Sequence, residues 1–109
     1  MPTNYKVLGQ SNPAATTATT LYTVPSATQT VVSTIVIANL AATAATFRIA
    51  VRVGGATLAN SQYVAYDITV GASDSTALTL GLTLNAADVI TVYASTTTLT
   101  FTAFGSEIS

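Results

Sequence analysis

With 109 residues, the chain is long enough for one domain that buries a single hydrophobic core. Three basic and four acidic residues give a net charge of −1, which excludes the basic face that nucleic-acid-binding proteins present. Charged residues make up 6% of the chain, against about 25% in ordinary soluble proteins, so the composition favours a surface that is covered in an assembly.

Two residue types that many functional sites need are missing from the sequence. There is no His and no Cys, which excludes a Ser-His-Asp triad, a disulfide and a zinc site with His or Cys ligands. The N-terminal MPTNYKVLGQ lacks the basic start and apolar stretch of a signal peptide, and the longest apolar runs are too short to cross a bilayer. We therefore expect no secretion signal, no membrane partner and no cofactor or metal.

Alternation of apolar and polar residues, which is typical of half-buried strands, runs through the chain, and no stretch has the spacing of an amphipathic helix. We predict strands at 5–9, 19–24, 30–40, 46–53, 62–70, 76–84, 89–94 and 98–104. Residues 1–18 are predicted to form the first strand and an extended linker, and residues 19–109 the β-sandwich domain, because residues 10–18 contain no core-forming side chain larger than Ala.

Two predicted strands differ in how their faces are divided. In TFRIAVRV (46–53), the apolar face carries Phe47, Ile49, Val51 and Val53, and the other face carries both arginines. In TVVSTIVIANL (30–40), both faces are apolar, since Val31, Ile35 and Ile37 oppose Val32, Val36 and Ala38. The second pattern predicts either a central strand or a strand that meets a partner subunit.

Turn signals separate these segments at short intervals, as an all-β fold requires. Pro25-Ser26 ends one strand, and hairpin turns are predicted at Gly54-Gly55, 71–75, 85–88 and 95–97. Eight short strands without a helix predict an all-β, antiparallel β-sandwich of jelly-roll type.

The order of the segments resembles a family of small bacteriophage virion structural proteins, over Asn4 to Ile108. The recognisable pieces are LYTVP (21–25), the run from Leu84 to Val92, and FGSEI (104–108). This resemblance implies a non-enzymatic structural protein of the particle. The resemblance fits a protein of the phage head and a protein of the phage tail equally.

The candidate contact residues with a subunit or a lattice partner are Arg48, Arg52, Val32, Val36 and Glu107. The two arginines share one strand face. They fit a solvent-facing strand, or charge-assisted pairs with Asp67 or Glu107 of the same or a neighbouring subunit, better than an anion site.

Two further groups of residues have structural and functional interpretations. Asp74 and Asp88 occupy turns, where Asp commonly bonds its own backbone, with a calcium site as the alternative. Regular pairing would place Tyr63 and Tyr66 on opposite faces of one strand, which favours core or interface roles over a sugar-binding platform.

We therefore expect a virion protein, made in the host cytoplasm, that is no enzyme and that decorates or cements the capsid shell. Its expected partners are copies of itself, with a trimer favoured, and the major capsid protein or other virion proteins. A tail, baseplate or fibre module is the nearest alternative. A carbohydrate-binding module for host glycans is the alternative of another class.

Overall fold

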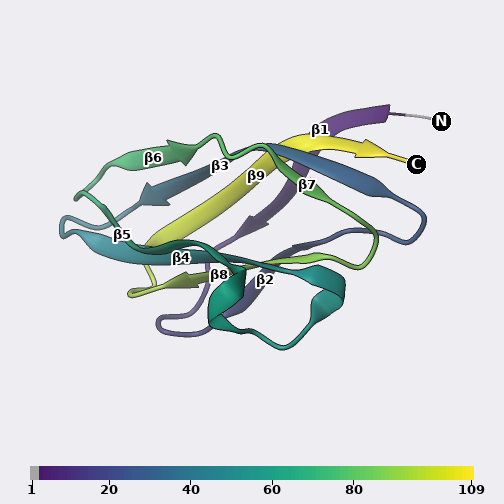
Figure 1. Ribbon diagram of the computed structural model, residues 1–109. Coiled ribbons are helices and arrows are strands. Elements are labelled where there is room, and N and C mark those ends of the chain that lie inside the picture. The colour runs from purple at the N-terminus through teal and green to yellow at the C-terminus, as the bar shows by residue number, and fades with distance from the viewer. Residues whose placement is uncertain (1–2) are drawn as a thin grey trace.

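The computed structural model describes residues 3–109 as two antiparallel β-sheets packed face to face (Figure 1). The five-stranded sheet has the order β1-β9-β3, with β6 and β7 both pairing with the far side of β3, and the four-stranded sheet has the order β2-β8-β4-β5. The strands are β1 (Thr3–Ser11), β2 (Thr19–Thr23), β3 (Gln29–Asn39), β4 (Ala45–Arg52), β5 (Tyr63–Val70), β6 (Ser75–Leu78), β7 (Leu82–Leu84), β8 (Val89–Ala94) and β9 (Leu99–Ile108).

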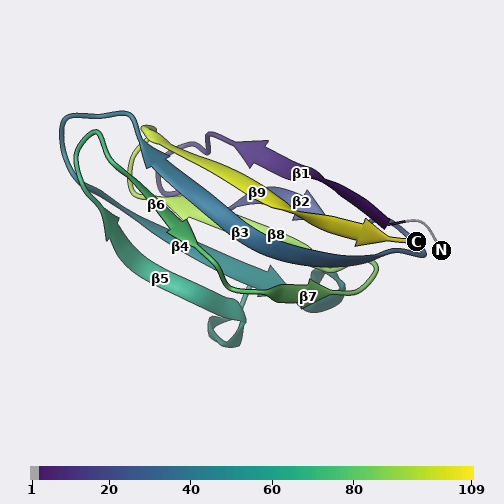
Figure 2. The same cartoon turned by 90° about the horizontal axis from the view of Figure 1, so that it is seen from above.

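The strand pairs are nested as in a jelly roll. β4 pairs with β5, β3 with β6 and β7, β2 with β8, and β1 with β9, while the β3–β9 and β4–β8 ladders complete the two sheets. Figure 2 shows the two layers from above. The prediction of an antiparallel β-sandwich without an α-helix is confirmed for residues 3–109.

Short 3₁₀ turns at η1 (Val53–Gly55) and η2 (Asn60–Gln62) are the helical segments of the described chain. Nowhere in residues 3–109 is there a helix with the length and apolar character to cross a membrane. Residues 3–109 form nine strands, one more than predicted, because the predicted strand 76–84 is interrupted between β6 and β7, where Gly81 has a φ of +63°. Leu80 in this break is 40% exposed.

The core between the sheets follows the alternation of the strands. Phe47 of β4 and Phe101 of β9 are fully buried and meet edge to face, with ring centroids 6.0 Å apart. Ile49 is also fully buried, as predicted, but Val53 is 71% exposed because β4 ends at Arg52 and a 3₁₀ turn follows. The predicted core position of Val53 is therefore wrong.

β3 is a central strand, with β9 on one side and β6 and β7 on the other. Its register against β9 shifts between Val32 and Thr34, which marks a β-bulge at Ser33. The bulge changes the alternation, so that Val32 and Ile35 are both buried in the core. The predicted grouping of Val31 with Ile35 is wrong for this reason, since a bulge reverses the faces of the residues before it.

The predicted turns occur, but three of the four predicted hairpins are wrong, because the strands that these turns join do not pair with each other. Only the connection through Gly54-Gly55 joins two strands that pair, and it is a ten-residue loop, 53–62, rather than a tight turn. The turns at 71–75, 85–88 and 95–97 cross from one sheet to the other. Tight turns carry no signal for whether the chain returns within a sheet or crosses to the facing sheet.

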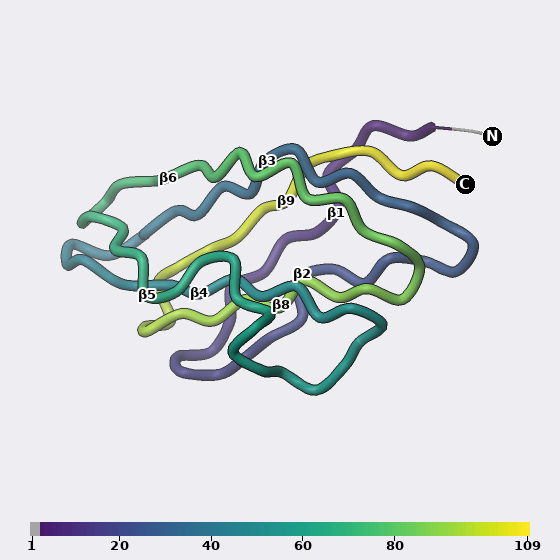
Figure 3. Tube along the Cα trace, viewed as in Figure 1, coloured from purple at the N-terminus to yellow at the C-terminus, as the bar shows by residue number. Residues whose placement is uncertain are grey.

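β1 is an edge strand of the five-stranded sheet and pairs with β9 along most of its length. Residues 12–18 then cross to β2 in the other sheet, and within the predicted segment 1–18 the first two residues lie outside the described residues. Gly9 lets β1 pack closely against β2, because a Cβ at Gly9 would lie 2.3 Å from the Leu21 carbonyl oxygen. Figure 3 shows that the two ends of the traced chain lie together at one end of the sandwich.

The turn before β8 offers a test of backbone strain. Exposed Ala87 has a φ of +70°, in the left-handed region that costs a non-glycine residue about 1–2 kcal/mol. We expect Ala87→Gly to raise the free energy of unfolding by up to ~1 kcal/mol, after the entropic cost of glycine is subtracted. Ala86→Gly in the same turn is the control and should lower it; urea denaturation of both variants measures the difference.

Candidate functional site

An apolar groove lies on the outer face of the five-stranded sheet, across β1, β9 and β3. It has a volume of about 580 Å³, and its residues are Tyr5, Lys6, Val7, Val31, Ser33, Phe104, Gly105 and Ser106. We call this surface the β1–β9–β3 groove. Tyr5 is 85% exposed, Val7 48% and Phe104 37%. Such a concentration of large apolar side chains on one sheet face is typical of an interaction surface.

The sheet register explains how this groove forms. Val7 of β1 and Thr34 of β3 both lie opposite Phe104 of β9, so the aromatic ring lies between two strands on the outer face. Next to it, Gly105 lets β3 approach closely, because a Cβ on Gly105 would lie 1.9 Å from the Val31 carbonyl oxygen. The bulge of β3 and a residue without a side chain thus create the groove together.

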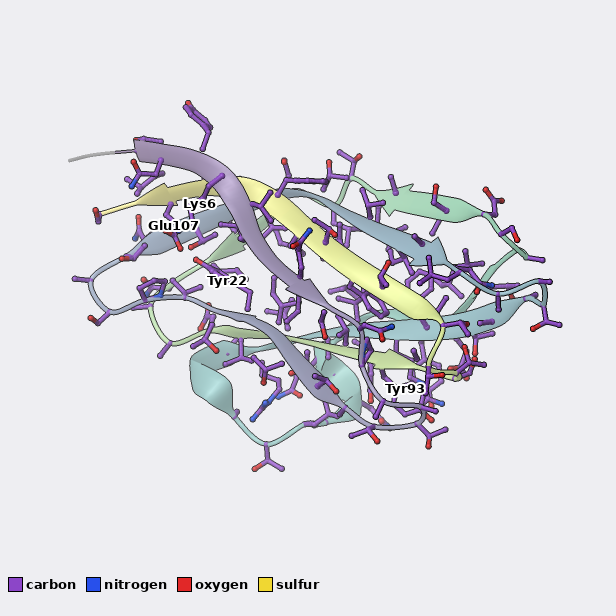
Figure 4. The ribbon with its side chains drawn as sticks, turned by 180° about the vertical axis from the view of Figure 1, so that it is seen from behind. Lys6, Tyr22, Tyr93 and Glu107 are labelled. Carbon is purple, nitrogen blue, oxygen red and sulfur yellow. The ribbon has the colours of Figure 1, made fainter. Side chains whose placement is uncertain are left out.

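A polar network borders the groove at the end of the sandwich near the chain termini (Figure 4). The Glu107 carboxylate accepts a hydrogen bond from the Tyr22 hydroxyl at 2.5 Å and forms an ion pair with Lys6 at 3.1 Å. The Tyr22 hydroxyl also bonds Thr30 Oγ1 at 2.8 Å, in the space between the sheets. Glu107, one of the predicted contact residues, therefore links β9 to β1 and to the facing sheet, and only 12% of its side chain is exposed.

These contacts shift the acid–base properties of the network. The hydrogen bond from Tyr22 and the neighbouring Lys6 ammonium hold the pKa of Glu107 below its ordinary value, although partial burial acts in the opposite direction. Burial and the adjacent carboxylate raise the pKa of Tyr22 to about 12. Glu107 is thus charged, and Tyr22 remains a proton donor, at neutral pH.

The network predicts a pH-dependent contribution to stability. Because the pKa of Glu107 is lower in the folded than in the unfolded chain, its contribution is complete above the ordinary pKa of 4.5 and is lost as pH falls through the lowered folded value. We expect Glu107→Gln to lower the melting temperature at pH 7, and the difference from the parent protein to shrink towards pH 3. Tyr22→Phe should reduce this pH dependence more than Lys6→Ala, since the Tyr22 hydrogen bond has the largest effect on the Glu107 pKa. A constant difference across pH would contradict this assignment.

A second cluster lies on the outer face of the four-stranded sheet, around the first predicted arginine. Arg48 binds Asp67 through two contacts, Nε to Oδ1 at 2.6 Å and Nη2 to Oδ2 at 3.3 Å. Its guanidinium carbon lies 4.1 Å from the ring centroid of Tyr66 and 4.4 Å from that of Tyr93. Tyr63 contacts Tyr66 edge to face, with centroids 5.0 Å apart. We call these five residues the Arg48 cluster.

The Arg48 cluster confirms one predicted pairing and corrects one prediction. Of the interpretations offered for Arg48, the pair with Asp67 occurs within one chain, and it holds the pKa of Asp67 below its ordinary value. The expected placement of Tyr63 and Tyr66 on opposite faces assumed regular pairing. The β4–β5 register is irregular on both sides of Ile49, and the two rings touch.

Arg52 has no carboxylate partner within residues 3–109 and binds the following loop instead. Its Nε donates to the Ala56 carbonyl at 2.7 Å and its Nη2 to the Gly55 carbonyl at 2.9 Å. It is thus engaged in holding the connection between β4 and β5. Of the two predicted valines, Val32 is 1% exposed in the core, whereas Val36 is half-buried on the outer face.

Several residues of the two surfaces were not singled out as contacts from the sequence. Tyr5 and Val7 lie on one face of a short first strand. Phe104 lies on the same face of β9 as Thr100 and Thr102, where a third polar residue would continue the pattern. A large apolar residue on a threonine-rich face could have indicated that Phe104 belongs to a contact surface. Tyr93 carried no comparable signal, because its proximity to Arg48 depends on the pairing of β8 with β4.

The two turn aspartates have structural partners. Asp88 accepts hydrogen bonds from the amides of Gly54 and Asn85, at 2.8 and 2.9 Å, and Asp74 accepts one from the amide of Ser75 at 2.8 Å. Within the described chain no group of three or more acidic residues converges as metal ligands would. The interpretation of both as turn-stabilising residues is confirmed.

No protein-family model matches the chain, and a search of curated proteins found no match.

Proposed function

We propose that this protein is a non-enzymatic structural component of a bacteriophage particle, most specifically a decoration or cement protein of the capsid shell. The observation that carries the proposal is the β1–β9–β3 groove, a partly apolar face in a chain with few charges. The resemblance to phage virion proteins supports the choice of particle. A tail, baseplate or fibre module would use the same surface chemistry.

The groove suggests how the protein associates. Tyr5 is a rigid, largely exposed aromatic side chain beside a cavity large enough to accept a side chain of that kind. A protruding group and a recess on the same face suit a contact between identical subunits. A cyclic trimer needs a head-to-tail contact, in which the groove of one copy meets a different surface of the next. We propose such a trimer, with Tyr5 at the edge of each contact and the remaining surface presented to the shell.

Self-association is directly testable. We expect the purified protein to form an oligomer at micromolar concentrations, as measured by size-exclusion chromatography with light scattering. Phe104→Ser and Tyr5→Ser should shift it towards the monomer, because they remove apolar area from the contact, while their circular dichroism spectra remain those of the parent. Val53→Ser is the matched control, since Val53 is 71% exposed but lies outside the groove. A parent protein that is monomeric throughout would contradict the proposed contact.

The location in the particle has its own test. Particles of the phage that encodes the chain should contain this protein by mass spectrometry, in a copy number set by the shell lattice. A cryo-electron microscopy map should show its density on the outside of the head. Density on the tail would favour the alternative module, and absence from the particle would overturn the proposal.

A further inference from the structure

The Arg48 cluster owes its form to a local irregularity of the sheet. Phe47 of β4 lies opposite Ile68 of β5, and Ile49 lies opposite Ala65. Arg48 alone therefore faces both Tyr66 and Asp67, which defines a β-bulge. Asp67 has a φ of +51°, in the left-handed region. Bulges of this kind redirect side chains and are frequent beside functional sites. Here the bulge brings an aromatic ring and a carboxylate to the same guanidinium.

The cluster holds polar groups in place without using all their hydrogen-bonding capacity. Two of the five N–H groups of Arg48 bind Asp67, which leaves three without a hydrogen-bond partner among residues 3–109. The Asp67 side chain is 47% exposed, and Tyr66 is 55% exposed. The ion pair and the contact with Tyr63 hold the ring of Tyr66 in position. The Arg48 guanidinium covers one face of the Tyr66 ring, and the side chain as a whole is still 55% exposed. The exposed part of an aromatic ring is thus flanked by an oriented donor and an oriented acceptor.

We propose that the Arg48 cluster binds a neutral pyranose unit of a glycan. One face of a pyranose ring presents C–H groups that pack on an aromatic ring, and its hydroxyls both donate and accept hydrogen bonds. Asp67 accepts from a hydroxyl and Arg48 donates to one, while Tyr66 supplies the stacking surface. The opposite charges of Arg48 and Asp67 cancel, so the site suits a neutral sugar better than an anion, which Asp67 would repel.

The position of the cluster makes glycan binding compatible with assembly. It lies on the outer face of the four-stranded sheet, whereas the β1–β9–β3 groove lies on the outer face of the five-stranded sheet. A subunit held through the groove would therefore leave the cluster accessible. An open, shallow site binds one sugar weakly, but several copies in one assembly would bind a multivalent surface much more tightly. The site itself does not depend on the proposed virion function.

The experiment is an NMR titration of the ¹⁵N-labelled protein with the methyl glycosides of glucose, galactose, mannose and N-acetylglucosamine, together with a printed glycan array. We expect at least one of these sugars to shift the amide signals of residues around Arg48, Tyr66 and Asp67. Tyr66→Ala should weaken the binding about ten-fold or more, and Tyr66→Phe should preserve it, because the ring rather than the hydroxyl forms the stacking surface.

Two further variants separate the site from the fold. Asp67→Asn removes the negative charge but retains a residue that tolerates the left-handed conformation, so it should fold and bind more weakly. Tyr5→Ala on the opposite sheet is the matched control and should bind as the parent does. The proposal is overturned if no sugar binds in either assay, if the shifted signals map away from the cluster, or if folded Tyr66→Ala binds like the parent. Binding of only anionic glycans would overturn the assignment of a neutral sugar.

Discussion

β3 and β9 pair along nearly their whole length, from Gln29 opposite Ile108 to Asn39 opposite Leu99. This ladder forms the centre of the five-stranded sheet, and the strands at both edges are added to it. Its one irregularity, the bulge at Ser33, places both Val32 and Ile35 in the core. The same region contains Gly105, whose missing side chain lets the backbones approach. The core on one side and the groove on the other therefore depend on one strand pair.

The sandwich separates two kinds of surface chemistry onto opposite faces. The outer face of the five-stranded sheet carries the groove with Tyr5, Val7 and Phe104. The outer face of the four-stranded sheet carries an ion pair stacked against tyrosines. An apolar recess suits a protein surface, whereas a ring beside oriented polar groups suits a small polar ligand. A protein with both could attach by one face and bind with the other.

Each of the few charged side chains has a defined partner within the subunit. Four of them form the pairs Lys6–Glu107 and Arg48–Asp67. The others, Arg52, Asp74 and Asp88, bond to backbone groups of loops and turns. The few charges therefore stabilise particular contacts inside the subunit. Little charge remains to keep an exposed apolar face from associating with another molecule.

The sequence by itself determined the class of the fold and most of its strands. Side chains alternate between the faces of a strand, so Phe47 and Ile49 could be assigned to the core from their spacing alone. The turn roles of Asp74 and Asp88 followed from the local chemistry of aspartate. The same spacing rule failed at Val31 and Val53, because a bulge and a strand end change the alternation without an obvious residue signal.

Only the tertiary structure decided which strands pair and which side chains therefore meet. Arg48 was known to share a strand face with Arg52, but its contacts with Tyr66, Asp67 and Tyr93 come from the register of β4 against two other strands. Tyr22 meets Glu107 across 85 residues of sequence, because β2 and β9 belong to facing sheets. Periodicity describes each strand separately, whereas pairing between strands depends on the packing of the whole chain, where each bulge shifts the partners that follow.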